Sequence, residues 1–108
     1  MNNKQNMMKS VRVEYKVKSA YVEKNKTNIS AVMMDLRENP IKGMNYVSYY
    51  LGEGKFMHLS NSMNEEVASQ LSKRDLFNKF RMELKASEPL EEPISIELTV
   101  VGSNVDLV

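Results

Sequence analysis

Hydrophobic and polar residues alternate in the stretch VRVEYKVK, residues 11–18. The apolar members of such a stretch share one face, so residues 11–18 are predicted to form a half-buried strand. Between residues 21 and 39 the apolar positions recur every three or four residues, which predicts a helix. Pro40 and Gly43 end this helix. Its apolar stripe also contains Asn25.

A glycine turn then separates two short stretches rich in Tyr, Val, Phe and Leu. Residues 44–51, MNYVSYYL, and 55–60, KFMHLS, flank the sequence Gly-Glu-Gly, which tolerates positive φ angles. They are predicted to form a hairpin with a loop at residues 52–54, in which Leu51 pairs with Lys55.

A broken second helix and a last strand follow. Two Ser-x-x-acid patterns, Ser62 with Glu65 and Ser72 with Asp75, predict helix starts. Pro89 and Pro93 lie in the loop that ends the helix. Residues 94–101, ISIELTVV, alternate as a strand. The predicted buried face of this strand consists of Ile94, Ile96, Leu98 and Val100.

This order of elements predicts an α+β, ferredoxin-like βαββαβ protomer with a four-stranded antiparallel sheet in the order 4-1-3-2. The strand at residues 44–51 then lies at an edge, although it carries large apolar or aromatic groups on both faces. An exposed apolar edge favours association, so we expect a homodimer in which two sheets pack together as a dimeric α+β barrel. Residues 11–104 are expected to form this single domain, with a flexible N-terminal tail at 1–10 and a C-terminal tail at 105–108.

The composition of the chain limits the kinds of active site and ligand that it can have. The 108 residues include no cysteine and one histidine, with a formal net charge of +1. Thiol chemistry is therefore excluded, and neither a metal site nor a bound cofactor is expected. The weak charge argues against nucleic-acid binding, and no apolar run reaches the roughly 18 residues of a membrane helix. We expect a cytoplasmic protein.

The hairpin register places the only histidine on a face that mixes aromatic rings and hydroxyls. The members of this face are Tyr46, Ser48, Tyr50, Phe56, His58 and Ser60. Such a mixture is typical of small-molecule pockets. His58 is either a group at this site or a structural histidine bonded to Ser48 or to a backbone carbonyl. Asn25 is either a pocket group or a solvated residue at the margin of its helix.

Several stretches in order resemble the antibiotic-biosynthesis-monooxygenase-like group, in an uncharacterised bacterial branch. They are VEYKVK, then Asn25, AVMMDLREN, GMNYVSYYLGEGKFMHLS, LFNKFRMELKASEPLEEP and ELTVVGSN, within about residues 11–104. Members of the group are dimeric α+β barrels, among them cofactor-independent oxygenases of polycyclic phenols and haem-degrading enzymes. The chain has no tryptophan, and the pattern of the haem-degrading enzymes is not met.

The resemblance implies an oxidoreductase in which substrate deprotonation gives an electron-rich anion that reacts with oxygen. His58 would be the acid/base, and Asn25 or a tyrosine hydroxyl would hold the oxyanion. The expected substrate-binding residues, Tyr46, Ser48, Tyr50 and Phe56, are joined by Phe77 and Phe80 of the second helix. Two alternatives stay open: a non-catalytic homodimer that binds a small aromatic or apolar ligand or has only a structural role, and an RNA-recognition domain, which shares the strand order.

Overall fold

The computed structural model describes residues 8–108, so most of the predicted N-terminal tail lies outside the described residues. The elements in order are β1 (Lys9–Lys16), η1 (Ser19–Tyr21), α2 (Val22–Glu38), β2 (Met44–Gly52), β3 (Lys55–Ser62), α3 (Glu65–Ser69), η2 (Leu71–Lys73), α4 (Asp75–Ala86) and β4 (Glu91–Leu98). The first strand begins two residues before the expected position.

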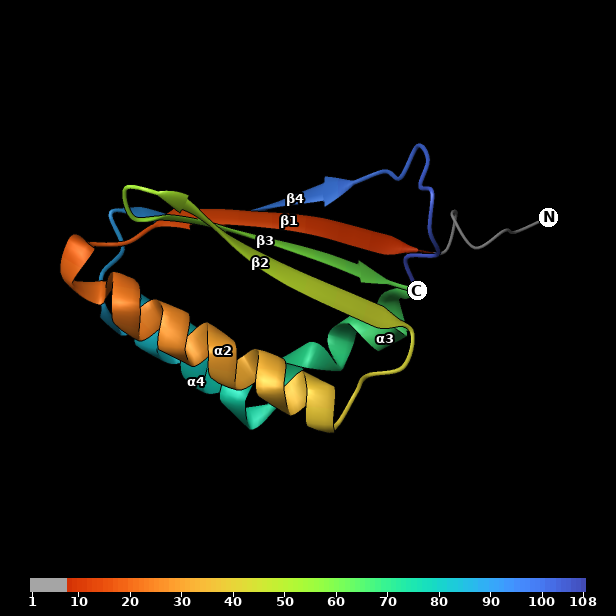
Figure 1. Cartoon of the computed structure of the whole chain (residues 1–108), viewed down its shortest axis with the longest axis horizontal. Coiled ribbons are helices and arrows are strands. Elements are labelled where there is room, and N and C mark those ends of the chain that lie inside the picture. Colours follow the sequence, from red (N-terminus) through yellow and green to blue (C-terminus); the bar gives the residue numbers. More distant parts are fainter. Residues whose placement is uncertain (1–7) are drawn as a thin grey trace.

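The four strands form one sheet in the order β2-β3-β1-β4, with every neighbouring pair antiparallel. This confirms the predicted α+β, ferredoxin-like fold and places β2 at an edge. Figure 1 shows the helices together on one face of the sheet, and none of the helices of residues 8–108 lies on the opposite face. We call that opposite face the outer face.

The core lies between the sheet and the helices. Alternation places one side of β1 and β3 toward α2 and α4, where their apolar side chains lose contact with water. The buried core cluster consists of Tyr15, Val17, Val32, Phe56, Phe80 and Leu84.

The hairpin register is largely as predicted. Ser48 lies opposite His58 and Tyr50 opposite Phe56. The predicted pairing of Leu51 with Lys55 is wrong, because a register shift after Tyr50 places Gly52 opposite Lys55. One extra residue on β2 is a local bulge, which leaves the register around His58 intact.

Neither predicted serine cap forms. The α3 helix is capped by Asn64, whose side chain accepts from the Val67 backbone N–H. Ser62 is instead buried at the end of β3. The α4 helix follows Arg74 without a side-chain cap, and the Ser72 hydroxyl donates to the Ser69 carbonyl.

The predicted buried face of the last strand is also wrong for the single chain. Ile94, Ile96 and Leu98 are 65%, 43% and 36% exposed, and Val100 lies beyond the end of β4. The register explains this, because Ser95 lies opposite Val13 and shares its helix-facing side. The apolar residues on either side of Ser95 therefore point to the outer face.

Candidate active site

Three neighbouring strands bring the candidate polar groups together on the helix-facing side of the sheet. His58 on β3 lies opposite Val13 of β1 on one side and opposite Ser48 of β2 on the other. Tyr15 follows two residues after Val13 and therefore shares its face. The α2 helix brings Asn25 to the same place, fully buried from solvent.

These residues form a continuous hydrogen-bonded chain. The Asn25 Nδ2 group donates to the Tyr15 hydroxyl oxygen at 2.8 Å. The Tyr15 hydroxyl lies 2.8 Å from His58 Nε2, and the Ser48 hydroxyl lies 2.6 Å from His58 Nδ1. Because the Tyr15 oxygen already accepts from Asn25, its proton is free to bond Nε2. The ring proton of a neutral His58 then sits on Nδ1 and is donated to Ser48.

All of these groups are neutral near pH 7. Burial lowers the pKa of His58 to about 4, because the buried ring loses the solvation that its charged form needs. Burial likewise raises the pKa of the Tyr15 and Tyr46 hydroxyls. An unperturbed histidine has a pKa of 6.5, so burial makes His58 a weaker base than the acid/base role expected from the sequence would require of an empty site.

A cavity of about 690 Å³ opens beside this chain of hydrogen bonds. Its walls include Tyr15, Tyr46, His58, Phe77 and Phe80. The His58 ring stacks between the two phenols, with centroids 5.4 Å from Tyr15 and 5.7 Å from Tyr46. The Phe80 ring meets His58 edge-on. Volume and lining together fit a small aromatic molecule.

No protein-family model and no curated protein matches the chain, but solved structures do. A Caulobacter crescentus CB15 protein, named provisionally as an antibiotic biosynthesis monooxygenase, is 16% identical with a TM-score of 0.75, covering 89% of this chain and 92% of that one. A structure named antibiotic biosynthesis monooxygenase is 10% identical with a TM-score of 0.74, covering 89% and 100%. A mutant of SnoaB, a cofactor-independent oxygenase from Streptomyces nogalater, is 9% identical with a TM-score of 0.68, covering 92% and 98%. The chain has the antibiotic biosynthesis monooxygenase fold. The resemblance seen in the sequence is thus confirmed as a likeness of fold.

Within this antibiotic biosynthesis monooxygenase fold, the predicted site residues separate into two groups. His58, Tyr46, Phe77 and Phe80 line the cavity. The other four do not line it, and each has a different place. Asn25 lies behind Tyr15, Ser48 lies behind His58, Phe56 is part of the core, and Tyr50 sits near the hairpin turn, where its hydroxyl accepts from the Gly54 backbone N–H.

Tyr15, which joins Asn25 to His58, was not among the site residues predicted from the sequence. Two available signals pointed to it. Tyr15 shares the buried face of the first predicted strand, and the predicted strand order placed that strand beside the one with His58.

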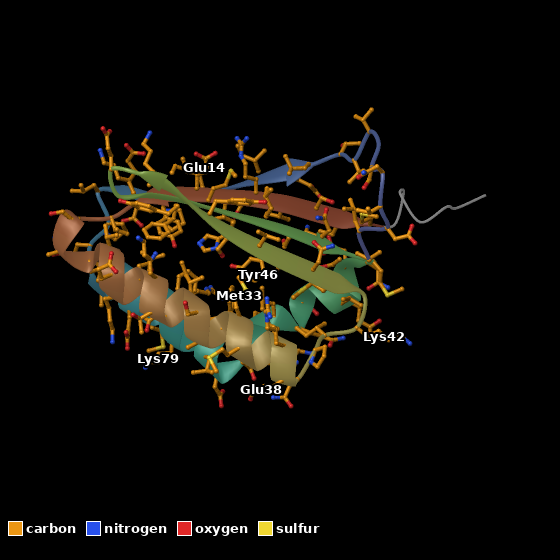
Figure 2. All side chains as sticks on the ribbon, viewed as in Figure 1. Glu14, Met33, Glu38, Lys42, Tyr46 and Lys79 are labelled. Carbon is orange, nitrogen blue, oxygen red and sulfur yellow. The ribbon has the colours of Figure 1, made fainter. Side chains whose placement is uncertain are left out.

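A second hollow, also of about 690 Å³, lies between α2 and the edge strand β2. Its lining includes Met33, Met44 and Ser48, and it shares Tyr46 with the first cavity. Figure 2 shows Met33 and Tyr46 close together between β2 and α2. The Tyr46 side chain therefore forms part of the wall of both hollows.

Across residues 8–108, His, Asp and Glu side chains form no group of three that is placed to hold a metal ion. Within the same range, no helix is both long and apolar enough to span a bilayer.

Proposed function

We propose that this protein is a cofactor-independent monooxygenase that oxidises a small aromatic substrate in the cavity beside His58. The observation that carries the proposal is a neutral phenol–imidazole pair at the wall of a cavity that several aromatic rings line. Asn25 and Ser48 support this pair by hydrogen bonds. The substrate itself supplies the electrons, and its methylene carbon, flanked by aromatic rings, is oxidised to a ketone. Dioxygen is reduced in the same reaction: one of its atoms enters the ketone, and the other leaves as water with both methylene hydrogens.

In this proposal the site removes the substrate proton through Tyr15. The Tyr15 oxygen takes the proton of the substrate hydroxyl while its own proton passes to His58 Nε2, 2.8 Å away. The imidazolium keeps its Nδ1 proton bonded to Ser48. His58 is a weak base while the site is empty, but the substrate anion beside it stabilises the charged ring and raises its pKa.

The remaining residues position the substrate. Asn25 orients the Tyr15 hydroxyl, in place of the direct oxyanion contact considered in the sequence analysis. Tyr46, whose hydroxyl lies 3.3 Å from His58 Nδ1, is the candidate donor to the oxyanion. Phe77 and Phe80 pack against the rings of the substrate. Phe56 acts only indirectly, because it stacks on Tyr15.

The test uses anthrone, a carbon acid in equilibrium with a phenol. Oxygen consumption and anthraquinone absorbance are measured for the wild type, His58→Gln, Tyr15→Phe and the control Tyr49→Phe, which changes a tyrosine outside the cavity lining. We expect the first two variants to lose about 100-fold or more in kcat and the control to keep its rate. If the wild type gives no rate above the uncatalysed reaction for anthrone or its hydroxylated derivatives, the catalytic proposal is wrong.

A non-catalytic ligand-binding protein is the second candidate. It is favoured by the engagement of both His58 ring nitrogens by protein groups, as in a structural histidine. Such a protein would bind an aromatic ligand in the cavity without turnover. His58→Gln would then change the ligand Kd only modestly.

We also propose that the protein is a homodimer joined through the outer faces of two sheets. Besides the three apolar residues of β4, Val47 and Tyr49 of β2 are exposed there. The Arg12 guanidinium pairs with Glu14 on the same face at 3.1 Å; Figure 2 shows Glu14 on the side of the sheet away from the helices. An apolar surface of this kind on a small chain favours a partner, and a second copy offers the same surface.

Sedimentation at micromolar concentration tests the dimer. The wild type is expected to sediment as a dimer, and Ile96→Glu, which places a charge on the outer face, as a monomer. A wild type that stays monomeric would rule out this assembly.

A further inference from the structure

The mouth of the cavity carries positive charge. Arg81 and Lys85 lie four residues apart on α4, so they share a side of the helix, and both line the cavity. Both are exposed to solvent, which places them at the mouth and not on the inner wall. Glu92 of β4 is the only carboxylate among the cavity-lining residues in the described part of the chain. Two cations therefore face one carboxylate at the mouth, whereas the inner groups are neutral.

Arg81 is held in place by the cavity wall. Its guanidinium carbon lies 5.6 Å from the centroid of the Phe77 ring, which is a cation–π contact. Within residues 8–108, no carboxylate lies within ion-pair distance of Arg81 or Lys85. Lys24 of α2, by contrast, pairs with Glu83 of α4 at 3.5 Å. The two cations at the mouth thus keep their charge available for a ligand.

Building on the proposed function, we infer that the ligand of this cavity is an aromatic compound with a carboxylate at the end opposite its phenol. Burying an anion against the neutral inner wall, formed by the buried side chains of Tyr15 and His58, is costly. The carboxylate therefore stays at the mouth, where Arg81 offers a planar donor pair and Lys85 a second charge. The phenol end reaches Tyr15 and Tyr46, and the rings lie along Phe77 and Phe80.

A matched pair of probes tests this polarity. 6-Hydroxy-2-naphthoate has a phenol and a carboxylate at opposite ends, and its methyl ester keeps the phenol and the rings but replaces the anionic carboxylate by a neutral ester with one added methyl group. Kd values for both probes are measured by naphthol fluorescence with the wild type, Arg81→Gln, Lys85→Gln and Lys79→Gln. Lys79 is the control, because it lies on the same helix but not in the cavity lining, and Figure 2 shows it on the side of the helices away from the sheet.

We expect Arg81→Gln to weaken binding of the acid about tenfold and Lys85→Gln to weaken it less. Both should leave the Kd of the ester within about twofold, and Lys79→Gln should change neither Kd. A Ser95→Trp variant, which fills the cavity from β4, should weaken both probes.

The possible failures are distinguishable. If the ester binds as tightly as the acid, or if Arg81→Gln affects both probes equally, the inference is wrong and the proposed function stands. If neither probe binds, or if Ser95→Trp leaves both unaffected, the cavity is not an aromatic site. The inference and the proposed function then fall together.

Discussion

At the scale of single residues, His58 owes its state to burial. The ring is 3% exposed, and its hydrogen-bond partners are neutral hydroxyls. Its pKa is therefore about 4 in the folded chain, against 6.5 for an unperturbed histidine. The site thus holds a neutral acceptor at neutral pH, which a charged imidazolium could not be.

This difference makes stability depend on pH. Between pH 6.5 and 4, His58 is protonated in the unfolded chain but neutral in the folded chain. The free energy of unfolding therefore falls as pH falls. From pH 6.5 to 5 we expect a loss of roughly 2 kcal/mol from this group, measured by urea unfolding. Because the chain has a single histidine, His58→Gln should remove this loss. Equal pH slopes for the two proteins would contradict the burial argument.

A second prediction concerns the support of the ring. Ser48→Ala leaves Nδ1 of His58 with only the Tyr46 hydroxyl at 3.3 Å. The free energy of unfolding should fall by about 1–2 kcal/mol, as measured by chemical unfolding. Ser60→Ala is the control, since Ser60 lies on the same hairpin and its side chain makes no hydrogen bond to the described residues. Equal losses in both variants would show that the Ser48 bond contributes nothing specific.

At the scale of elements, the turn between β2 and β3 joins the hairpin to β1. The Val17 backbone N–H donates to the Gly54 carbonyl at 2.9 Å, and a Cβ on residue 54 would collide with the Val17 carbonyl oxygen. Gly52 has a similar positive φ of 89° but open space around it. A comparison of the two positions therefore separates the effect of backbone strain from the effect of close packing.

Alanine at each glycine measures the two effects. Gly52→Ala should cost roughly 1 kcal/mol in the free energy of unfolding, from the left-handed backbone alone. Gly54→Ala should cost at least about 2 kcal/mol, because the collision adds to the same strain. Thermal and urea unfolding of both variants check this difference. Similar costs would mean that the turn moves away from β1 without penalty.

The secondary-structure elements also show which parts of the fold and the site could be predicted from the sequence. The strict alternation in β1 and in the hairpin correctly predicted which residues share a face. This prediction does not depend on how the helices are placed, because one face of each strand packs against helices. The caps failed because the local pattern around Ser62 does not reveal that this hydroxyl is buried at the end of β3, two residues before Asn64. Only some of the predicted site residues line the cavity, again because the local sequence pattern does not show how the elements pack. His58 and Phe56 share a face, but which part of that face is hollow depends on how the helices cover it.

At the scale of the whole molecule, the apolar side chains of β4 lie on the outer face of the sheet. Alternation in the sequence shows that one side of this strand is apolar, but it does not show whether that side packs in the core of the chain or against a partner. If two copies cover each other there, unfolding is linked to dissociation. The thermal midpoint of the wild type should then rise with protein concentration across the micromolar range, as measured by calorimetry. For Ile96→Glu the midpoint should be lower and independent of concentration. A concentration-independent midpoint in the wild type would speak against a dimer coupled to folding.

The stacking of Tyr15, His58 and Tyr46 has a practical consequence for spectroscopy. A lone imidazole next to two phenol rings experiences the ring currents of both, so its carbon-bound protons should resonate away from the positions found in a free histidine. With a single histidine in the chain, these signals need no assignment by mutagenesis. A proton NMR titration would therefore report the occupancy of the cavity before any natural ligand is identified.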